Sequence, residues 1–173
     1  MAQGTGDPLH PRPTDNAVFG PASGGSAEPT YGGVLSFMRR RYSRDLSGVD
    51  VAILGIPFDA AVSNRTGSRF GPQAIRRASA ILDGDPQYPF HMDPFEVLSV
   101  VDWGDVSWDY QRPWQAHDCI HAQASEILAS GAKLFSLGGD HSVTYPLLVA
   151  HAERHGPLAI VHFDAHQDTW GDE

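Results

Sequence analysis

The sequence predicts an α/β fold, in which a parallel sheet forms the middle of three layers and helices cover both faces. From residue 49 onward, short apolar runs of strand length alternate with longer stretches whose apolar residues have helical spacing. Such alternation produces a parallel sheet with right-handed crossovers. Polar residues directly follow most of the apolar runs, as expected where strands end at a site. With 173 residues, of which 41% are hydrophobic, the chain can form one domain or part of a larger one.

The first strand is expected over residues 51–56, because this continuous apolar run is typical of a strand buried on both faces. Pro57 ends the run, and composition predicts a loop over residues 59–71. Pro72 stands where a helix can begin, since the first turn needs no hydrogen bond from that nitrogen. Apolar residues then follow at helical spacing, namely Ala74, Ile75, Ala78, Ile81 and Leu82.

The remaining elements follow as strand, helix, strand, helix and strand, over residues 95–101, 114–130, 133–137, 145–155 and 158–163. Gly131 and Gly156 directly follow the two helices and suit their C-terminal ends. Residues 1–30 are rich in Gly, Pro, Ser and Thr, which predicts an irregular arm ahead of a domain over residues 31–173.

Composition disfavours several classes of protein. A formal charge of -9 argues against a nucleic-acid partner, because phosphate binding needs clustered Lys and Arg. No apolar run approaches the roughly 20 residues of a membrane span, and no signal peptide is recognisable. Cys119 is the single cysteine, so an internal disulfide is impossible, which fits a cytoplasmic protein.

Two clusters of histidine and carboxylate residues carry the chemistry. Residues 138–142 read Gly-Gly-Asp-His-Ser, and residues 164–168 read Asp-Ala-His-Gln-Asp. Each cluster follows a predicted strand, and the carboxyl ends of parallel strands meet at one edge of a sheet. Imidazole and carboxylate together suit a divalent metal such as Mn²⁺. The sequence therefore predicts a metal site at this edge.

The spacing of the second cluster supports convergence on one point. In an extended backbone Asp164, His166 and Asp168 lie on the same side, and with His141 they form the predicted ligand set. Carboxylates can bridge two cations, so a pair of metals about 3.5–4 Å apart would hold a hydroxide as nucleophile. Asp140 and Ser142 are candidates for orienting the imidazoles.

The other histidines receive a structural interpretation. His117 and His121 lie four residues apart on a predicted helix, a spacing that can bind metal, but the sequence offers no partner ligands there. The surface of a helix is therefore favoured for this pair. His151, His155 and His162 are also interpreted as structural.

Four segments together resemble the ureohydrolases, the arginase–agmatinase family, over roughly residues 30–173. Residues 53–59 resemble the family's first core strand and turn, and residues 63–76 resemble its loop with glycine and arginine and the helix that follows. Residues 136–142 and 162–169 resemble its first two metal motifs. Within the family, the Ser-Asn-Arg loop and the form of the second metal motif are more similar to agmatinases than to arginases.

The resemblance implies an arginase-like fold and hydrolysis of a guanidino group to urea and an amine with two Mn²⁺ per complete site. Agmatine would give putrescine, a step of polyamine metabolism. His141 would bind one metal and His166 the other, while Asp164 and Asp168 would be the carboxylate ligands, at least one of them bridging. The implied partners are a small guanidino substrate and further copies of the chain in a homo-oligomer.

One departure from the family pattern is large. The family has a third metal motif, Ser-x-Asp-x-Asp, and a later His and acidic residue that act on the substrate, and all would lie beyond Glu173. Four of six protein ligands are then present, and the catalytic and substrate-binding residues stay unassigned. We expect the N-terminal part of an enzyme whose C-terminal part, with the later strands, is missing. Such a chain should bind manganese weakly and hydrolyse little or nothing.

Other functions remain open at this point. Guanidinobutyrase, guanidinopropionase or another amidinohydrolase would use the same motifs. Arginase and formiminoglutamase are further alternatives, whose substrates carry an α-amino acid head. A non-catalytic metal-binding fragment is the alternative from a different class.

Overall fold

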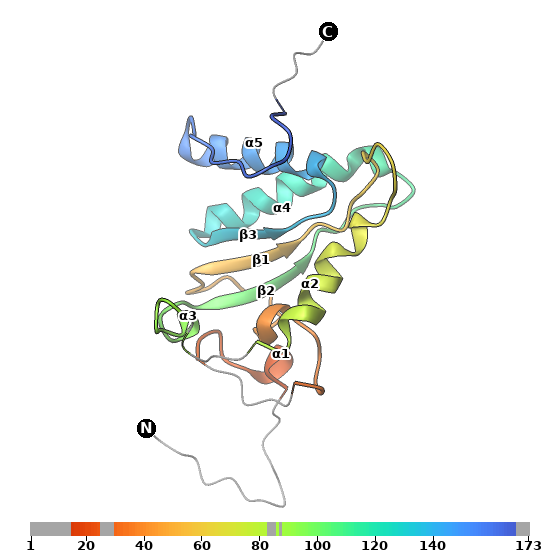
Figure 1. Ribbon diagram of the computed structural model, residues 1–173. Helices are drawn as coiled ribbons and strands as arrows, with labels where there is room; N and C mark the ends of the chain where they lie inside the picture. The colour runs from red at the N-terminus through yellow and green to blue at the C-terminus, as the bar shows by residue number, and fades with distance from the viewer. Residues whose placement is uncertain (1–14, 25–29, 83–85, 87, 169–173) are drawn as a thin grey trace, which may run out of the picture.

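A three-stranded parallel sheet forms the centre of the molecule (Figure 1). The computed structural model describes residues 15–24, 30–82, 86 and 88–168. The strands are β1 (Val51–Gly55), β2 (Val100–Asp105) and β3 (Lys133–Leu137), in the order β2-β1-β3. Val51 pairs with Val100 on one side and with Lys133 on the other, so β1 is the central strand.

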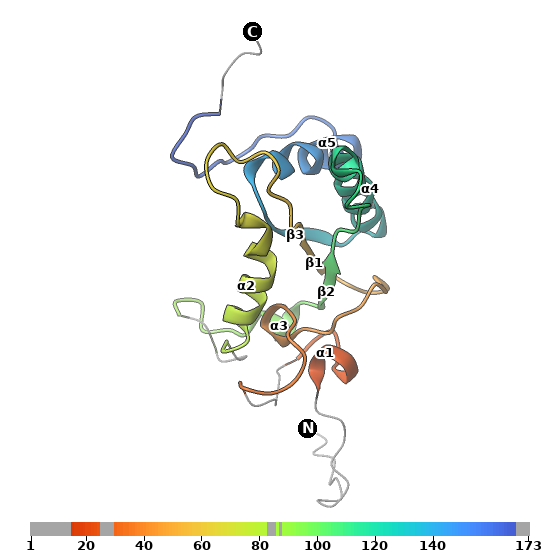
Figure 2. The same ribbon diagram turned by 90° about the vertical axis from the view of Figure 1, so that its right-hand side faces the viewer.

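Helices cover both faces of this sheet, which confirms the predicted three layers (Figure 2). Helix α2 (Gly71–Ser79) lies on one face, and α4 (Ala116–Ser130) and α5 (Thr144–His155) lie on the other. The shorter helices are α1 (Asn16–Phe19), α3 (Pro94–Val97) and the 3₁₀ turns η1 (Phe37–Arg39), η2 (Ser68–Phe70), η3 (Pro113–Gln115) and η4 (His141–Val143).

The main core lies between the sheet and α4. Leu54 of β1 and Ile120 of α4 are both fully buried in it, together with Trp103 of β2. The buried positions of α4 recur every three or four residues, as the packed face of a helix requires: Ala116, Ile120, Ala124, Ile127 and Leu128. Gly131 ends the helix in the left-handed region, with φ 92°, where glycine is favoured. The predicted strands 51–56 and 133–137 and helices 114–130 and 145–155 are therefore confirmed to within a few residues.

Helix α2 packs through a polar face. Pro72 is in its first turn as predicted, but Ile75 of the predicted apolar row is 40% exposed, and the buried positions are Pro72, Arg76 and Ser79. The Arg76 guanidinium donates to both oxygens of the buried Asp102, at 2.7 and 2.9 Å, and to Asp105 at 2.6 Å. Burial disfavours the charged guanidinium, yet these carboxylates more than offset it and raise the pKa of Arg76 above its usual value.

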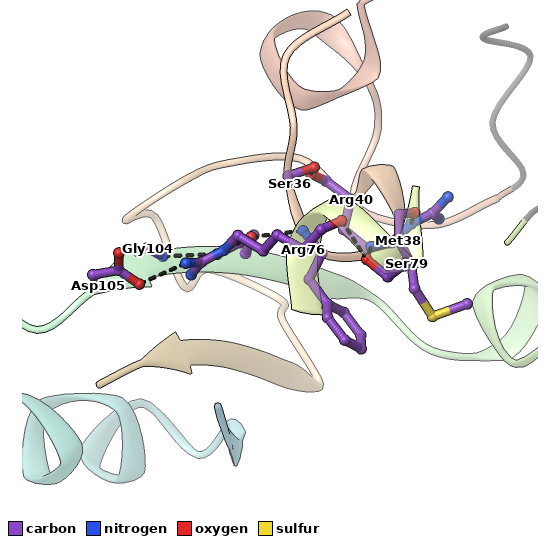
Figure 3. A network of polar contacts seen from close by, with 9 residues as sticks. Ser36, Met38, Arg40, Arg76, Ser79, Gly104 and Asp105 are labelled. Atoms are coloured by element: carbon purple, nitrogen blue, oxygen red, sulfur yellow. Dashed lines mark hydrogen bonds and ion pairs between the residues drawn. The ribbon is translucent and has the colours of Figure 1, made fainter. Parts of the chain in front are cut away.

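The same polar network holds the segment before β1 in place (Figure 3). The backbone N–H of Phe37 donates to Asp102 at 2.7 Å, and that of Met38 donates to Ser79 Oγ at 2.8 Å. Asp102 thereby joins β2 to α2 and to η1. These polar groups satisfy one another beside a small apolar cluster, in which Phe37 and Met38 of η1 pack against Ile53 of β1.

The predicted strand over residues 95–101 is wrong in its first half. Residues 94–97 form α3 instead, because Pro94 occupies its first turn and Asp93 caps it by accepting from the Phe95 N–H at 2.9 Å. Strand β2 begins only at Val100 and continues to Asp105.

The predicted strand over residues 158–163 does not form. These residues have no regular structure, and their apolar side chains face solvent, with Phe163 94% exposed. An apolar run becomes a strand only when its backbone finds ladder partners, and none of the described residues pairs with it. The outer edge of β3 is likewise unpaired within the described part of the chain.

Part of the predicted N-terminal arm lies against the domain. Residues 15–24 are described, and residues 1–14 and 25–29 lie outside the described residues. The Ala17 carbonyl accepts from the Tyr42 N–H at 2.9 Å, and the Ala22 carbonyl accepts from the Val100 N–H at 2.9 Å. None of the helices in the described ranges has the length and apolarity that crossing a membrane demands.

Candidate metal centre

Four side chains that can ligate a metal meet beyond the carboxyl end of β3. His141 begins η4, after the short turn that follows β3, and His162, Asp164 and Asp168 lie in the segment that follows α5. One ligand atom from each of the four lies within 4.8 Å of the others. All four residues are exposed, so solvent reaches the cluster.

The contacts inside the cluster join its two segments. His141 Nε2 lies 2.7 Å from Asp168 Oδ2, and His162 Nε2 lies 3.4 Å from Asp164 Oδ2 and 3.9 Å from Asp168 Oδ2. The rings of His141 and His162 are stacked, with centroids 5.2 Å apart and planes 11° from parallel. Two imidazoles and two carboxylates thus face one small volume.

The observed cluster overlaps with the predicted ligand set. It contains His141, Asp164 and Asp168 of that set, whereas the His166 ring is 82% exposed and lies beside Asp164, with Nδ1 3.4 Å from Oδ1. His162, for which the sequence predicts a structural role, occupies the fourth place. The alternation that selected positions 164, 166 and 168 would also have selected position 162, two residues earlier. That alternation requires an extended backbone, but Asp168 has φ 48°, in the left-handed region.

Asp164 is ionised in this setting. The backbone N–H of His166 donates to it at 2.8 Å and lowers the pKa of its carboxyl, an effect that the nearby imidazoles of His162, His141 and His166 reinforce. A carboxylate must be deprotonated to ligate a metal, so the local hydrogen bond prepares the residue for that task.

Asp140 anchors the turn that carries His141. Its Oδ1 accepts from the Ser142 N–H at 3.0 Å and from the Ser142 hydroxyl at 2.6 Å, and its Oδ2 accepts from the Ala61 N–H at 2.8 Å. Since the Ser142 hydroxyl donates to Asp140, His117 Nε2 donates to Ser142 Oγ across 3.0 Å. Asp140 and Ser142 are the orienting residues that the sequence predicts, whereas no local sequence signal indicates that His117 belongs to the same chain of contacts.

Of the two ring nitrogens of His141, only Nε2 points into the cluster. Thr144 Oγ1 lies 3.2 Å from its Nδ1, and its Nε2 faces Asp168.

The turn before His141 leaves no room for a side chain at Gly139. A Cβ on this residue would come within 1.9 Å of the Phe58 carbonyl oxygen. The donor set and the open surroundings fit a hard or borderline divalent cation that also takes water or substrate as ligands.

Residues 49–173 match the Arginase family. The chain belongs to the arginase family. Among curated members, the agmatinase of Chromobacterium violaceum is 60% identical over 151 residues, which cover 87% of this chain and 47% of that protein. The chain therefore spans about half the length of the curated relatives it matches.

Solved structures of this family share the fold. A hypothetical agmatinase from Burkholderia thailandensis is 50% identical, with a TM-score of 0.88 over 92% of this chain and 51% of that one. Proclavaminate amidino hydrolase from Streptomyces clavuligerus is 38% identical, with a TM-score of 0.72 over 82% of this chain and 47% of that one. These likenesses confirm the predicted arginase-like sheet with helices on both faces.

Proposed function

We propose that the chain carries the first two metal motifs of an agmatinase, which hydrolyses the guanidino group of agmatine to urea and putrescine with two Mn²⁺ per complete site. The observation that carries this proposal is the meeting of two imidazoles and two carboxylates at the carboxyl end of β3. The identity of 60% to a curated agmatinase supports the choice of agmatine over other guanidino compounds.

The residues of this chain would hold the metals and keep the site rigid. The proposed ligands are His141, Asp164, His166 and Asp168. His162 is an alternative ligand to His166, because its ring lies within the cluster. Asp140 and Ser142 would keep the turn of His141 in register with the β1–α2 loop. Divalent metal ions, when bound, act as Lewis acids and make water a nucleophile near neutral pH.

The proposed activity needs the part of the relatives' sequence that this chain does not span. The further ligands and the residues that protonate the leaving amine would come from the region that this chain does not span. The 173-residue chain alone is then expected to bind Mn²⁺ weakly and to release no measurable urea from agmatine.

The test is a chimera in which residues 1–173 are followed by the corresponding downstream half of the Chromobacterium violaceum agmatinase. With Mn²⁺ it should release urea and putrescine from agmatine in equal amounts. His141→Ala in the chimera should abolish turnover, because one metal loses its imidazole, whereas His155→Ala, at the exposed end of α5, should leave it unchanged. A folded, manganese-loaded chimera without turnover, or one that His141→Ala leaves active, would refute the proposal.

A second candidate, another amidinohydrolase, is favoured by a specific observation. The proclavaminate amidino hydrolase structure is 38% identical and covers nearly as much of this chain as the agmatinase structure does. Rates on agmatine, 4-guanidinobutyrate, 3-guanidinopropionate and arginine decide between these activities. Agmatine has no carboxylate, so a requirement for one on the substrate would exclude agmatinase.

Assembly and location belong to the same proposal. The exposed apolar segment 158–163 and the unpaired edge of β3 favour burial against further protein, which the later strands of the complete protein would provide. The complete protein would in turn form a homo-oligomer. A cytoplasmic location is supported by Cys119, which is a free thiol.

A further inference from the structure

The first turn of α4 brings a histidine to the turn that carries the ligand His141. His117 is half-buried, and its Nε2 lies 3.0 Å from Oγ of Ser142, the residue directly after that ligand. The two side chains are 25 residues apart in sequence and belong to different elements, α4 and η4. The contact therefore joins a helix that packs on the sheet to the edge of the metal cluster.

The hydrogen atoms available at this contact determine its direction. The Ser142 hydroxyl donates its single hydrogen to Asp140 Oδ1 at 2.6 Å, so toward the imidazole it can only accept. His117 must then carry its hydrogen on Nε2. An apolar ring of the same size would fill the space but would take this donor away from Ser142. Packing alone therefore does not explain a histidine at this position.

Phe58 of the β1–α2 loop closes these contacts into a circuit. Its side chain is buried and packs against the imidazole of His117, with centroids 5.3 Å apart at 58°. Its carbonyl oxygen accepts from the Asp140 N–H at 2.8 Å. Phe58, Asp140, Ser142 and His117 thus form a closed series of contacts that includes the residues on both sides of the ligand.

The circuit restrains the backbone on both sides of His141. Asp140 is 7% exposed and also accepts from the Ala61 N–H, so the β1–α2 loop fixes the residue before the ligand. Through Ser142, His117 fixes the residue after it. With both neighbours held, the direction of the His141 side chain is restricted, and its Nε2 points into the cluster. Groups that orient a metal ligand in this way raise the affinity of the site.

We propose that His117 is a positioning residue of the metal centre, which acts through Ser142 and keeps His141 directed at the bound metal. This role rests on the proposed function in one respect, since the cluster must bind a divalent metal. No contact of His117 with the metal or the substrate is part of the role. The task of the imidazole is to donate one hydrogen bond from Nε2.

The hydrogen on Nε2 can be observed without any metal. The isotope-labelled 173-residue chain is studied in EDTA at pH about 8, where imidazole is ordinarily neutral, by long-range proton–nitrogen NMR. His117 should be the Nε2–H tautomer, and its ring hydrogen should exchange slowly with water, whereas Ser142→Ala should restore fast exchange. The Nδ1–H tautomer, or exchange that Ser142→Ala leaves unchanged, would overturn the proposal. This measurement needs no variant of His117, so it decides even where such a variant is unstable.

Titration with Mn²⁺, followed by electron paramagnetic resonance, measures the effect on the metal. His117→Phe keeps a ring beside Phe58 but has no donor. It should weaken binding about three- to ten-fold, less than the loss of a direct partner of the ligand, because Ser142 lies between. His117→Gln, whose amide can donate to Ser142, should recover most of the affinity. In a chain that already carries Ser142→Ala, His117→Phe should have no further effect, because both act through one bond.

His121→Phe is the matched control. His121 lies one turn further along α4, and its Nε2 contacts Glu153 of α5 at 2.8 Å instead. The same substitution there should leave the Mn²⁺ affinity unchanged. Circular dichroism and thermal unfolding establish that each variant is folded.

The possible failures separate this role from the proposed function. Equal Mn²⁺ affinities of the wild-type chain and His117→Phe would overturn the role of His117 alone and leave the metal centre intact. A loss that His117→Gln does not recover would mean that packing against Phe58 matters and the hydrogen bond does not, which also overturns it. A folded wild-type chain that binds no Mn²⁺ would instead refute the metal centre itself, and the role of His117 with it.

Discussion

At the scale of single residues, His162 and His166 compete for one place in the metal cluster. His162 Nε2 lies 3.4 Å from Asp164 and faces the cluster, whereas His166 is mostly exposed. If the structure of this chain sets the ligands, His162→Ala should weaken Mn²⁺ binding about ten-fold or more and His166→Ala should have little effect. Removal of a ligand or its support has effects of this size. Electron paramagnetic resonance of Mn²⁺ during titration measures both, and the reverse order would restore the ligand set predicted from sequence.

Asp59 should make the stability of the chain depend on pH in a narrow acidic range. The hydrogen bond from Arg69 lowers the pKa of the Asp59 carboxyl from 3.8 to about 2, helped by the N–H groups of Gly67 and Arg69. The folded state therefore holds the ionised form more strongly than the unfolded state does. This stabilisation is complete above pH about 5 and is lost as the pH falls through 3.8 toward 2.

Asp59→Asn removes that contribution, so the difference in unfolding free energy between the wild-type chain and the variant should be constant above pH about 5. It should then shrink as the pH falls toward 2. Urea unfolding between neutral pH and pH about 2.5 measures it. A difference that does not change over this range would mean that the Arg69 contact is not maintained in solution.

At the scale of elements, the turn between β3 and η4 tolerates no side chain at one of its two glycines. A Cβ on Gly139 would meet the Phe58 oxygen at 1.9 Å and the Ile56 oxygen at 2.7 Å, whereas a Cβ on Gly138 meets only Val143, at 3.8 Å. Gly139→Ala should therefore destabilise the chain by about 3 kcal/mol or more, since the backbone must move. The neighbouring Gly138→Ala should cost less than about 1 kcal/mol. Chemical denaturation compares the two, and similar values would contradict the close approach of these backbones.

Helices and strands are predicted correctly where the local sequence alone determines their burial. The strand over residues 51–56 is recognisable from a continuous apolar run, and the helix over residues 114–130 from its apolar periodicity, because burial follows directly from both signals. For residues 95–97 hydrophobicity predicts a strand, but the local signal of Asp93 and Pro94, which start a helix, outweighs it in the structure. The apolar run 158–163 had the composition of a strand, but a strand also needs a neighbour, and composition does not supply one.

The candidate site likewise combines residues that a local sequence pattern identifies with contacts that only the folded chain brings together. The residue types and their positions after strands identified His141, Asp164 and Asp168, which the structure brings together. Choosing between His162 and His166 requires the backbone path of the segment, which spacing alone does not give. The contacts of Asp140 with Ala61 and of Ser142 with His117 join segments that are remote in sequence, so no local pattern announces them.

At the scale of the whole molecule, one edge of the sheet should drive association. Phe135 of β3 is half exposed beside the unpaired outer edge, and residues 158–163 add further exposed apolar surface. Sedimentation velocity should show association that increases with concentration, and Phe135→Lys should reduce it, because a charge on an edge strand opposes pairing. Tyr145→Lys adds the same charge at an exposed aromatic residue of α5 and should have less effect. A monomer at all concentrations, or equal effects of the two variants, would contradict this role of β3.

The central position of β1 also determines when this chain can begin to fold. Val51 pairs with Val100 and with Lys133, so the innermost strand is synthesised first and both of its neighbours emerge from the ribosome later. At about 5–20 residues per second, the most apolar strand waits for several seconds before its partners exist. Pairings between distant segments also form slowly, because a long loop must close first. Nascent chains of this protein are therefore expected to depend on chaperones that shield residues 51–56 until β3 has been made.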